Sequence, residues 1–181
     1  MLEEAMAYLR AAIPPGANGF EGEHYRLEAF DPHPHPENLR LLIGGGGTVK
    51  TPRIAGRFAD EFNIYACPPD RYREKASTAL DHAREAGRDP DSILFSTACP
   101  GIAATKESDY RALLEKLSDV TGQSPEHIEK VYEERGYPHG HGSKPAEMRA
   151  ALEEAGCGRF YVQAFAADVE TYGLIFEAYE A

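Results

Sequence analysis

Long apolar segments are missing from this sequence. Among its 181 residues there is no uninterrupted apolar run of about 18 residues, the length that a membrane-spanning helix requires. A secretory signal segment is missing as well. We therefore expect a protein that does not span a membrane and is not exported by a signal peptide.

Cysteine is scarce. The three cysteines, Cys67, Cys99 and Cys157, are odd in number and widely separated. They predict neither a disulfide framework nor a zinc site, and they fit the reducing environment of the cytoplasm, where we expect the protein to be.

Positive charge is also in short supply. The chain has 19 Lys and Arg against 30 Asp and Glu, so its formal net charge is −11, which argues against nucleic acid as the main partner. Because this charge repels anions, a bound phosphate would need a local cradle.

What the chain does contain is a regular alternation of strand and helix patterns. Its length suits a single domain over residues 1–181, in which four strands are expected to begin near Leu39, Glu61, Ser92 and Arg159. Helical patterns cover roughly residues 2–13, 52–59, 70–84, 107–120, 125–135, 145–154 and 168–179. This order predicts an α/β fold with a parallel sheet, whose strand exits at residues 44–48, 63–68, 99–101 and 163–166 lie at one edge.

The segment from Leu39 to Thr48 is the most informative. Its apolar residues up to Ile43 are typical of a buried strand, and four glycines, Gly44 to Gly47, follow. Consecutive glycines are tolerated where the backbone needs a positive φ or where a ligand contacts bare backbone. With Thr51 as the expected N-cap and Pro52 as the first helical residue, the segment predicts an anion cradle at a helix N-terminus. A flexible turn without a ligand is the alternative.

Two common phosphate-binding motifs are excluded. Val49 stands where the P-loop motif requires glycine, so an NTPase is not predicted. The dinucleotide-binding pattern fails because its third glycine would fall on Val49 or Lys50.

Two loops carry His-x-His pairs. His33 and His35 alternate with prolines in an irregular stretch over residues 17–37, which also holds a strand or hairpin at 23–27, and His139 and His141 lie in a loop over residues 137–143. We interpret all four as solvated loop residues, because no Cys or carboxylate at a diagnostic spacing accompanies the pairs. A metal site built from both pairs, or a place beside a substrate entrance, is the alternative.

Five segments share the pattern of one known family. They are LLIGGGGT at 41–48, TPRIAGRF at 51–58, ADEFN at 59–63, FEGEHYRL at 20–27 and AGCGRFYVQ at 155–163. Together they resemble the bacterial luciferase-like oxidoreductases, and most closely the branch that uses the deazaflavin coenzyme F420. The resemblance extends over nearly the whole chain.

This resemblance implies a fold and an assembly. The family folds as a (β/α)8 barrel, and the chain matches only its later half, about strands five to eight. We therefore expect a partial (β/α)8 TIM-barrel-like fold, a half-barrel of about four parallel strands with helices. Four strands cannot close such a barrel, and an open sheet leaves unpaired edges. We expect a homodimer, a partner chain that completes the barrel, or a fragment of a longer protein, and a marginally stable isolated monomer.

The resemblance also implies a cofactor site. In the family, the phosphate of the flavin or deazaflavin lies against the backbone after the glycine-bearing strand and the next strand. The expected cofactor is F420, with FMN as the alternative, and the catalytic residues are not identified. The residues expected to bind the cofactor are Ile43, Gly44, Gly45, Gly46, Gly47, Thr48, Asn63, Tyr65, Ala66 and Cys67.

Several of these residues and their neighbours have structural interpretations as well. Asn63 could hydrogen-bond a neighbouring turn, Glu61 could form a salt bridge rather than act as a base, and Lys50 and Lys144 are candidate anion contacts. Prolines follow Cys67, so a small buried residue is predicted there rather than a nucleophile. Tyr65 is expected to face the ligand. The aromatic residues expected in the core are Phe58, Phe62, Phe95, Phe160, Tyr161 and Phe165.

Three functions follow as hypotheses. The first is an oxidoreductase that transfers hydride between reduced F420 or FMN and a small organic substrate. The second is a non-catalytic cofactor-binding half-barrel that needs a partner chain. The third is a general sugar-phosphate-binding α/β domain, for which the same glycine segment would suffice.

Overall fold

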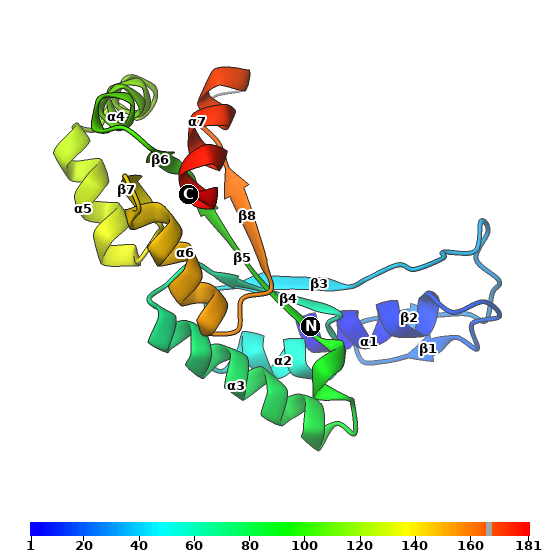
Figure 1. Cartoon of the computed structure of the whole chain (residues 1–181). Helices are drawn as coiled ribbons and strands as arrows, with labels where there is room; N and C mark the ends of the chain where they lie inside the picture. The colour runs from blue at the N-terminus through cyan, green and yellow to red at the C-terminus, as the bar shows by residue number, and fades with distance from the viewer. Residues whose placement is uncertain (166–167) are drawn as a thin grey trace.

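A four-stranded parallel sheet forms the centre of the molecule (Figure 1). The computed structural model describes residues 1–165 and 168–181. The strands of the sheet lie in the order β3 (Leu42–Gly45), β4 (Glu61–Tyr65), β5 (Leu94–Pro100) and β8 (Arg159–Gln163). Because all four run in the same direction, their carboxyl ends meet at one edge, as predicted. Residue 166 of the last predicted strand exit lies outside the described residues.

Two helices cover one face of this sheet. α2 (Lys50–Phe58) follows β3, and α3 (Pro69–Glu85) follows β4; the short 3-10 helix η1 (Pro90–Ser92) leads into β5. The inward side chains of the strands, among them Ile43, Phe62 and Phe95, pack in one cluster with apolar residues of α2 and α3. Phe62 and Ile64 are fully buried, whereas Tyr65 is exposed, so Phe62 lies in the core as predicted and burial alternates at this end of β4.

Four further helices surround a second, two-stranded sheet. β5 continues after Gly101 into β6 (Ile102–Ala104), which pairs in parallel with β7 (His139–His141). Around this pair lie α4 (Glu107–Thr121), α5 (Pro125–Arg135), α6 (Lys144–Glu154) and α7 (Val169–Glu180) (Figure 1). A second apolar cluster joins β6 to α4, α5 and α7. Gly101, between β5 and β6, lets the chain pass close to β8, because a Cβ on Gly101 would collide with Val162.

The N-terminal elements extend to one side, at the right of Figure 1. α1 (Leu2–Ala12) is followed by an antiparallel hairpin of β1 (Phe20–Glu21) and β2 (Arg26–Leu27). Arg10 joins α1 to the sheet layer by donating to the carbonyl of Phe58 and to Asp60 Oδ1, each at 2.6 Å. In the described part of the chain, we find no helix with the length and apolar character needed to traverse a bilayer.

Four predictions about local structure were wrong. β3 begins at Leu42 rather than Leu39, whose side chain is 52% exposed, and it continues through Gly44 and Gly45. α2 begins one residue before Thr51, and its N-cap position is Val49. The supposed loop at 137–143 contains β7, because its residues pair with β6. Tyr161 is 38% exposed and not in the core.

The other aromatic residues predicted in the core do pack there, although not all of them are fully buried. Phe62 and Phe95 are buried in the first cluster, and Phe58, Phe160 and Phe165 pack against the clusters as partly buried residues.

Candidate functional site

The side of the sheet opposite α2 and α3 is lined with polar side chains. Residues in register on neighbouring parallel strands point to the same side, and Gly44, Asn63 and Ser96 form one such row. We call this side the open face. It is lined by Gly44, Glu61, Asn63, Ser96, Arg159 and Tyr161, and Leu42 and Leu94 lie on it in the same row as Glu61.

An ion pair and a tyrosine hydroxyl fix Glu61 on the open face. Arg159 Nη1 donates to Glu61 Oε2 at 2.8 Å, and the Tyr161 hydroxyl donates to Glu61 Oε1 at 3.0 Å. The Glu61 side chain is only 4% exposed, whereas that of Arg159 is 45% exposed. A buried carboxylate requires such partners. Of the two interpretations of Glu61 from the sequence, a salt bridge and a general base, the structure shows the salt bridge.

Asn63 is also fixed by a neighbouring strand. Its side-chain amide Nδ2 donates to Ser96 Oγ at 2.9 Å. The partner is a strand residue of β5 rather than a turn. Asn63 remains partly accessible, so this hydrogen bond orients it at the sheet surface, next to Gly44.

The four glycines divide into two kinds. None of them has a positive φ, so their conformational freedom is not the reason for their presence. A Cβ on Gly45 or Gly47 would lie 3.0 or 2.8 Å from the side chain of Thr51, so a larger residue there would force Thr51 to shift. A Cβ on Gly44 or Gly46 would have its nearest neighbour at 3.8 Å. At Gly44 and Gly46 no packing contact requires glycine, and the backbone there is exposed to a ligand.

The exit of β3 leads directly to the N-terminus of α2. Gly46, Gly47 and Thr48 are exposed, and no side chain in residues 1–165 or 168–181 caps the helix. The first-turn N–H groups of such a helix lack intrahelical partners and favour an anion. Lys50 is the first helical residue and is exposed beside them. The predicted strand, glycine segment and helix N-terminus are therefore adjacent, although Thr51 packs against the glycines instead of capping the helix.

The exit of β4 lies beside this segment. Tyr65 is 47% exposed, a Cβ on Gly46 would lie 3.8 Å from the Tyr65 Cβ, and the Tyr65 ring lies 6.2 Å from that of Tyr137. Ala66 and Cys67 are buried. Burial raises the pKa of the Cys67 thiol, although Lys75 Nζ lies 3.9 Å from its sulfur. A buried thiol with a raised pKa is a poor nucleophile, which agrees with the packing role predicted for Cys67.

The structure thus brings part of the predicted site together. Gly44, Gly46, Asn63 and Tyr65 present accessible atoms along one edge of the open face, where Thr48 also lies. The side chains of Ile43 and Cys67 belong to the core behind the sheet, and Ala66 belongs to the second cluster. Only the backbone of these three residues can take part in binding.

Arg159 and Tyr161 were missed as residues of the open face. Along β8, exposed Arg159, Tyr161 and Gln163 alternate with partly buried Phe160 and Val162. This period of two was visible in the sequence, but Tyr161 was assigned to the core because of its aromatic ring. The alternation was the signal that could have found both residues.

The two His-x-His pairs do not form one site. His139 is buried, its Nδ1 lies 2.7 Å from the Tyr137 carbonyl oxygen, and burial lowers its pKa. The prediction of a solvated loop residue is wrong for His139. Its Nε2 and the Lys144 ammonium both lie near Glu133, at 3.4 and 3.2 Å. Lys144 therefore already has an anionic partner.

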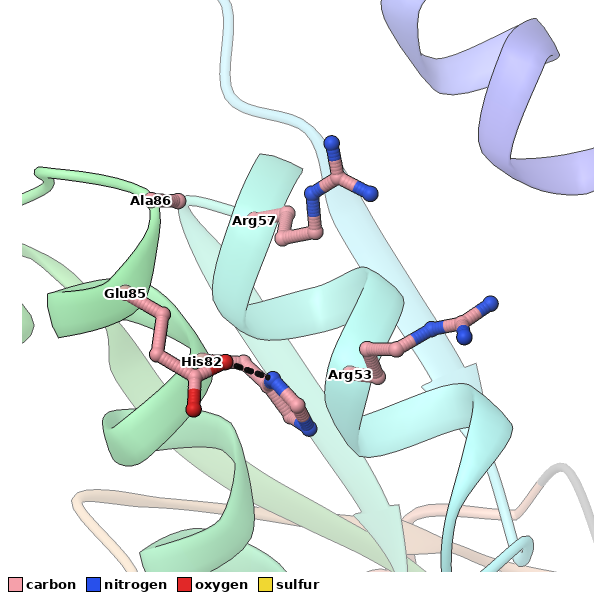
Figure 2. A pocket seen from close by; sticks show the side chains of 5 residues that line it. All are labelled: Arg53, Arg57, His82, Glu85 and Ala86. Carbon is pink, nitrogen blue, oxygen red and sulfur yellow. Dashed lines mark hydrogen bonds and ion pairs between the residues drawn. The ribbon is translucent and has the colours of Figure 1, made fainter.

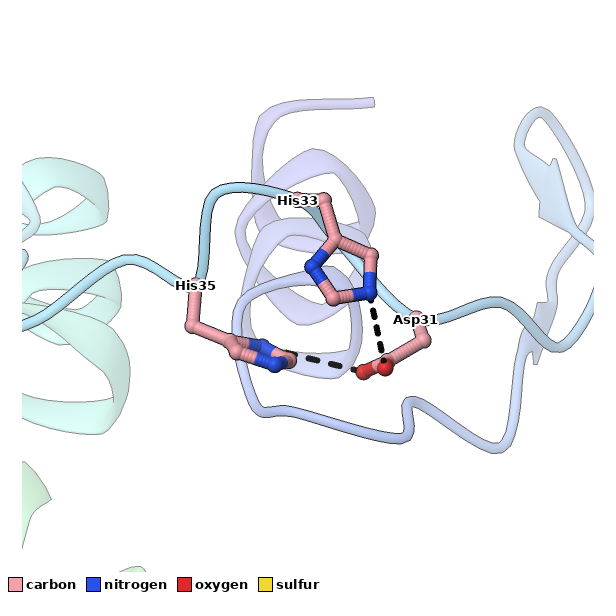
Figure 3. Close-up of side chains that lie close together, drawn as sticks. All are labelled: Asp31, His33 and His35. Carbon is pink, nitrogen blue, oxygen red and sulfur yellow. Dashed lines mark ion pairs between the residues drawn. The ribbon is translucent and has the colours of Figure 1, made fainter.

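His33 and His35 lie beside the carboxylate of Asp31, which was not predicted as their partner. Figure 3 shows both imidazoles beside Asp31, at 3.1 Å for His33 Nε2 and 3.7 Å for His35 Nδ1. Within residues 1–165 and 168–181, these three residues are the only group of His, Cys, Asp or Glu with the spacing of metal ligands.

A cleft of about 420 Å³ lies between α2 and α3, on the helical side of the molecule (Figure 2). Arg53 and Arg57 from α2 line it opposite His82 and Glu85 from α3. Both arginines pair with Glu3 of α1, and His82 Nδ1 lies 2.7 Å from Glu85 Oε2. Because its cations are already paired and it lies behind the sheet, this cleft is not a candidate cofactor site.

Comparisons with solved structures identify the architecture. An F420-dependent secondary alcohol dehydrogenase, in complex with an F420-acetone adduct, superposes with a TM-score of 0.74 at 18% identity, covering 98% of this chain and 59% of that chain. The coenzyme F420-dependent tetrahydromethanopterin reductase of Methanopyrus kandleri gives 0.62 at 15% identity, covering 96% and 58%. Riboflavin lyase (RcaE), with modified FMN and riboflavin, gives 0.67 at 14% identity, covering 88% and 46%.

These likenesses establish the fold. The chain spans less than two thirds of the length of these structures, so its four-stranded sheet corresponds to a partial barrel, as predicted. No curated protein sequence matches the chain. The sequence model of the luciferase-like monooxygenases matches residues 1–178. The chain belongs to the luciferase-like monooxygenase family.

Proposed function

We propose that this chain binds a flavin-type cofactor as part of an oxidoreductase that transfers hydride to or from a small organic substrate. F420 is the cofactor we favour, and FMN is the alternative. One observation carries this proposal: the exposed backbone of Gly46 and Gly47 lies at the uncapped N-terminus of α2, next to the open face. Membership of the family and the F420- and FMN-associated structures of the same fold support it.

The residues present fit the phosphate of such a cofactor. Backbone N–H groups after Gly46 and the hydroxyl of Thr48 would hold it, and the positive end of α2 favours its charge. This local arrangement is needed because the chain has a net charge of −11. When bound, the cofactor supplies or accepts the hydride. Asn63 and Tyr65 would position its ring system along the edge of the open face.

We also propose that a second copy or a separate chain covers the open face. Among the described residues, β3 and β8 are the two edges of the four-stranded sheet, and each presents backbone groups that pair with no further strand of this sheet. A buried Glu61 with its ion pair on the sheet surface is typical of an interior rather than of a free surface. The groups that exchange protons with the substrate would then come from the covering chain.

A second candidate function is a non-catalytic cofactor-binding subunit. The same exposed backbone at Gly46 and Gly47 would serve it, and the well-partnered Glu61 favours it, because the described open face offers no free carboxylate for acid–base catalysis within hydrogen-bond reach of Asn63. Turnover distinguishes the two functions.

The test is a spectroscopic titration of the full chain with F420 and with FMN, followed by reoxidation of the reduced cofactor in the presence of candidate substrates. Saturable binding with substrate-dependent reoxidation supports the oxidoreductase, and binding without turnover supports the subunit. If neither cofactor binds, both functions are wrong.

The variant Gly46→Ala tests the location of the site. A Cβ at Gly46 has room within the chain, so the fold is retained while the exposed backbone is covered. We expect cofactor binding to weaken about tenfold, or about 1.4 kcal/mol. Gly173→Ala is the matched control, because a Cβ there meets no atom within 4 Å and the residue lies in α7. Unchanged binding in Gly46→Ala would place the cofactor elsewhere.

A further inference from the structure

We propose that Asp31, His33 and His35 bind a divalent transition-metal ion of the class that includes zinc, nickel and copper. The three residues lie in the proline-rich segment between β2 and β3, away from the open face. One carboxylate oxygen and one imidazole nitrogen from each histidine lie within 4.8 Å of one another. Neither family membership nor the proposed cofactor site requires this group.

The spacing of the ligand atoms suits a tetrahedral ion. Bonds of about 2.0–2.1 Å to nitrogen and oxygen place two ligands of a tetrahedral zinc about 3.3 Å apart. Asp31 Oδ2 lies 3.1 Å from His33 Nε2 and Asp31 Oδ1 lies 3.7 Å from His35 Nδ1, on either side of this value, and the three ligand atoms all lie within 4.8 Å of one another. An ion between the three groups therefore needs only small side-chain rotations.

The backbone holds the ligands in place before any ion binds. Pro32, Pro34 and Pro36 restrict the segment on both sides of each histidine. The N–H of Gly16 donates to Asp31 Oδ1 at 2.9 Å, and the N–H of Phe30 donates to the carbonyl of Ala17 at 3.1 Å. Outer contacts of this kind orient a ligating carboxylate and increase metal affinity.

The chemistry of the ligand set selects the class of ion. Two imidazoles and one carboxylate suit zinc, nickel or copper, whereas calcium and magnesium favour sites made of oxygen ligands. All three side chains are between 44% and 69% exposed, so an ion enters directly from solvent. Three protein ligands leave a fourth tetrahedral position for water or for another ligand. The net charge of −11 adds a general attraction for cations.

The test is calorimetric titration of the tag-free, chelator-treated full chain with zinc chloride. We expect one ion per chain, with a dissociation constant of about 1 µM. His33→Ala, His35→Ala and Asp31→Asn should each weaken binding at least about tenfold, since each removes one of three ligands. Asp31→Asn keeps an oxygen acceptor for the N–H of Gly16, so it removes the charge without freeing the loop.

His141→Ala is the matched control. His141 is the exposed member of the other His-x-His pair, so its removal deletes one imidazole outside the group. We expect binding by this variant to be unchanged. A second measurement replaces zinc with cobalt, whose intense visible absorption in a four-coordinate site should be lost in His33→Ala.

Three results would each overturn the proposal. They are no saturable binding at one ion per chain, unchanged affinity in His33→Ala and His35→Ala, and an equal loss of affinity in His141→Ala. Far-ultraviolet circular dichroism of every variant should match that of the parent chain, because the mutated side chains are exposed.

Discussion

At the scale of single residues, Thr51 explains a part of the glycine segment that conformational arguments do not. The Thr51 side chain fills the space beside Gly45 and Gly47, and its place there depends on where α2 starts. Gly44 and Gly46 have no such close neighbour, because a Cβ on either residue would meet its nearest atom only at 3.8 Å. Gly45 and Gly47 therefore make room for the Thr51 side chain, whereas Gly44 and Gly46 have no such role in packing.

A double-mutant cycle tests this division. Gly47→Ala should lower the free energy of unfolding by about 1–3 kcal/mol, because its Cβ would lie 2.8 Å from Thr51 Oγ1. Gly46→Ala should change it by less than about 0.5 kcal/mol. In the Thr51→Ala variant, the further change Gly47→Ala should lower the free energy of unfolding much less than it does in the parent chain. Urea unfolding measures all four values; equal losses in Gly46→Ala and Gly47→Ala would contradict the division.

The partners of Glu61 give a second residue-scale prediction. Tyr161→Phe removes one hydrogen bond to Glu61 and should cost about 1 kcal/mol of unfolding free energy. Arg159→Ala should cost more, because it leaves the buried carboxylate without its cation, and Arg159→Lys should lie between the two. Urea unfolding of the three variants gives the order. A smaller loss for Arg159→Ala than for Tyr161→Phe would mean that the ion pair does not hold Glu61.

At the scale of elements, α7 begins with an N-cap that carries a charge. Asp168 accepts a hydrogen bond from the N–H of Thr171 at 2.8 Å and pairs with Lys116 Nζ at 2.7 Å. The contact with Lys116, followed by the bond from Thr171, lowers the pKa of Asp168 from 3.8 to about 2. A lowered pKa means that the folded state favours the ionised carboxylate.

This cap predicts a pH dependence. The stability that Asp168 supplies is fully present above pH 3.8 and is lost as the pH falls toward about 2. Asp168→Ala should therefore lower the urea midpoint at pH 7, with a difference from the parent chain that narrows below pH 3.8. Asp168→Asn, which keeps an acceptor for the N–H of Thr171, should lose less. A difference that stays constant down to about pH 2 would contradict the role of the charge.

Most elements could be predicted because their signals are local. Ser124 accepts from the N–H of His127 at 3.3 Å, so α5 starts where its cap predicts, and apolar alternation placed β4. β7 could not be predicted, because His139–His141 contains no apolar pattern and becomes a strand only by pairing with β6. The predicted start of α2 was wrong for a related reason. Thr51 is a strong cap by residue type, but its side chain packs against Gly45 and Gly47 instead.

The candidate site was predictable in part. Parallel strands bring their carboxyl ends together, so the meeting of Gly46 with Tyr65 followed from the order of the elements. The inward burial of Ile43 and Cys67 depends on which face α2 and α3 cover. The reach of Arg159 across the sheet to Glu61 depends on side-chain length and on contacts between residues 98 positions apart, which no local pattern encodes.

At the scale of the whole molecule, the described part of the chain leaves β3 and β8 as edge strands of the sheet, and one face of the sheet carries polar side chains. The family model matches residues 1–178, but the chain covers only 59% of a structure with the same fold, so it corresponds to part of a barrel. Closing the barrel requires strands beyond the four of this sheet. Association should therefore stabilise the fold.

Sedimentation velocity tests this expectation. We expect the 19.9 kDa chain to self-associate, or to associate with its partner chain, with a melting temperature that rises with concentration. A monodisperse monomer with a sharp, concentration-independent melt would contradict the need for a covering chain. Far-ultraviolet circular dichroism at each concentration controls for unfolding.

The central claim is that the exposed backbone at Gly46 to Thr48 holds the phosphate of a flavin-type cofactor. Its most direct test compares dissociation constants for cofactors with and without that phosphate: F420 against its phosphate-free deazaflavin, and FMN against riboflavin. We expect the phosphate to tighten binding at least about tenfold in the pair that binds, because the ring systems within each pair are the same. Equal dissociation constants within that pair would contradict the claim.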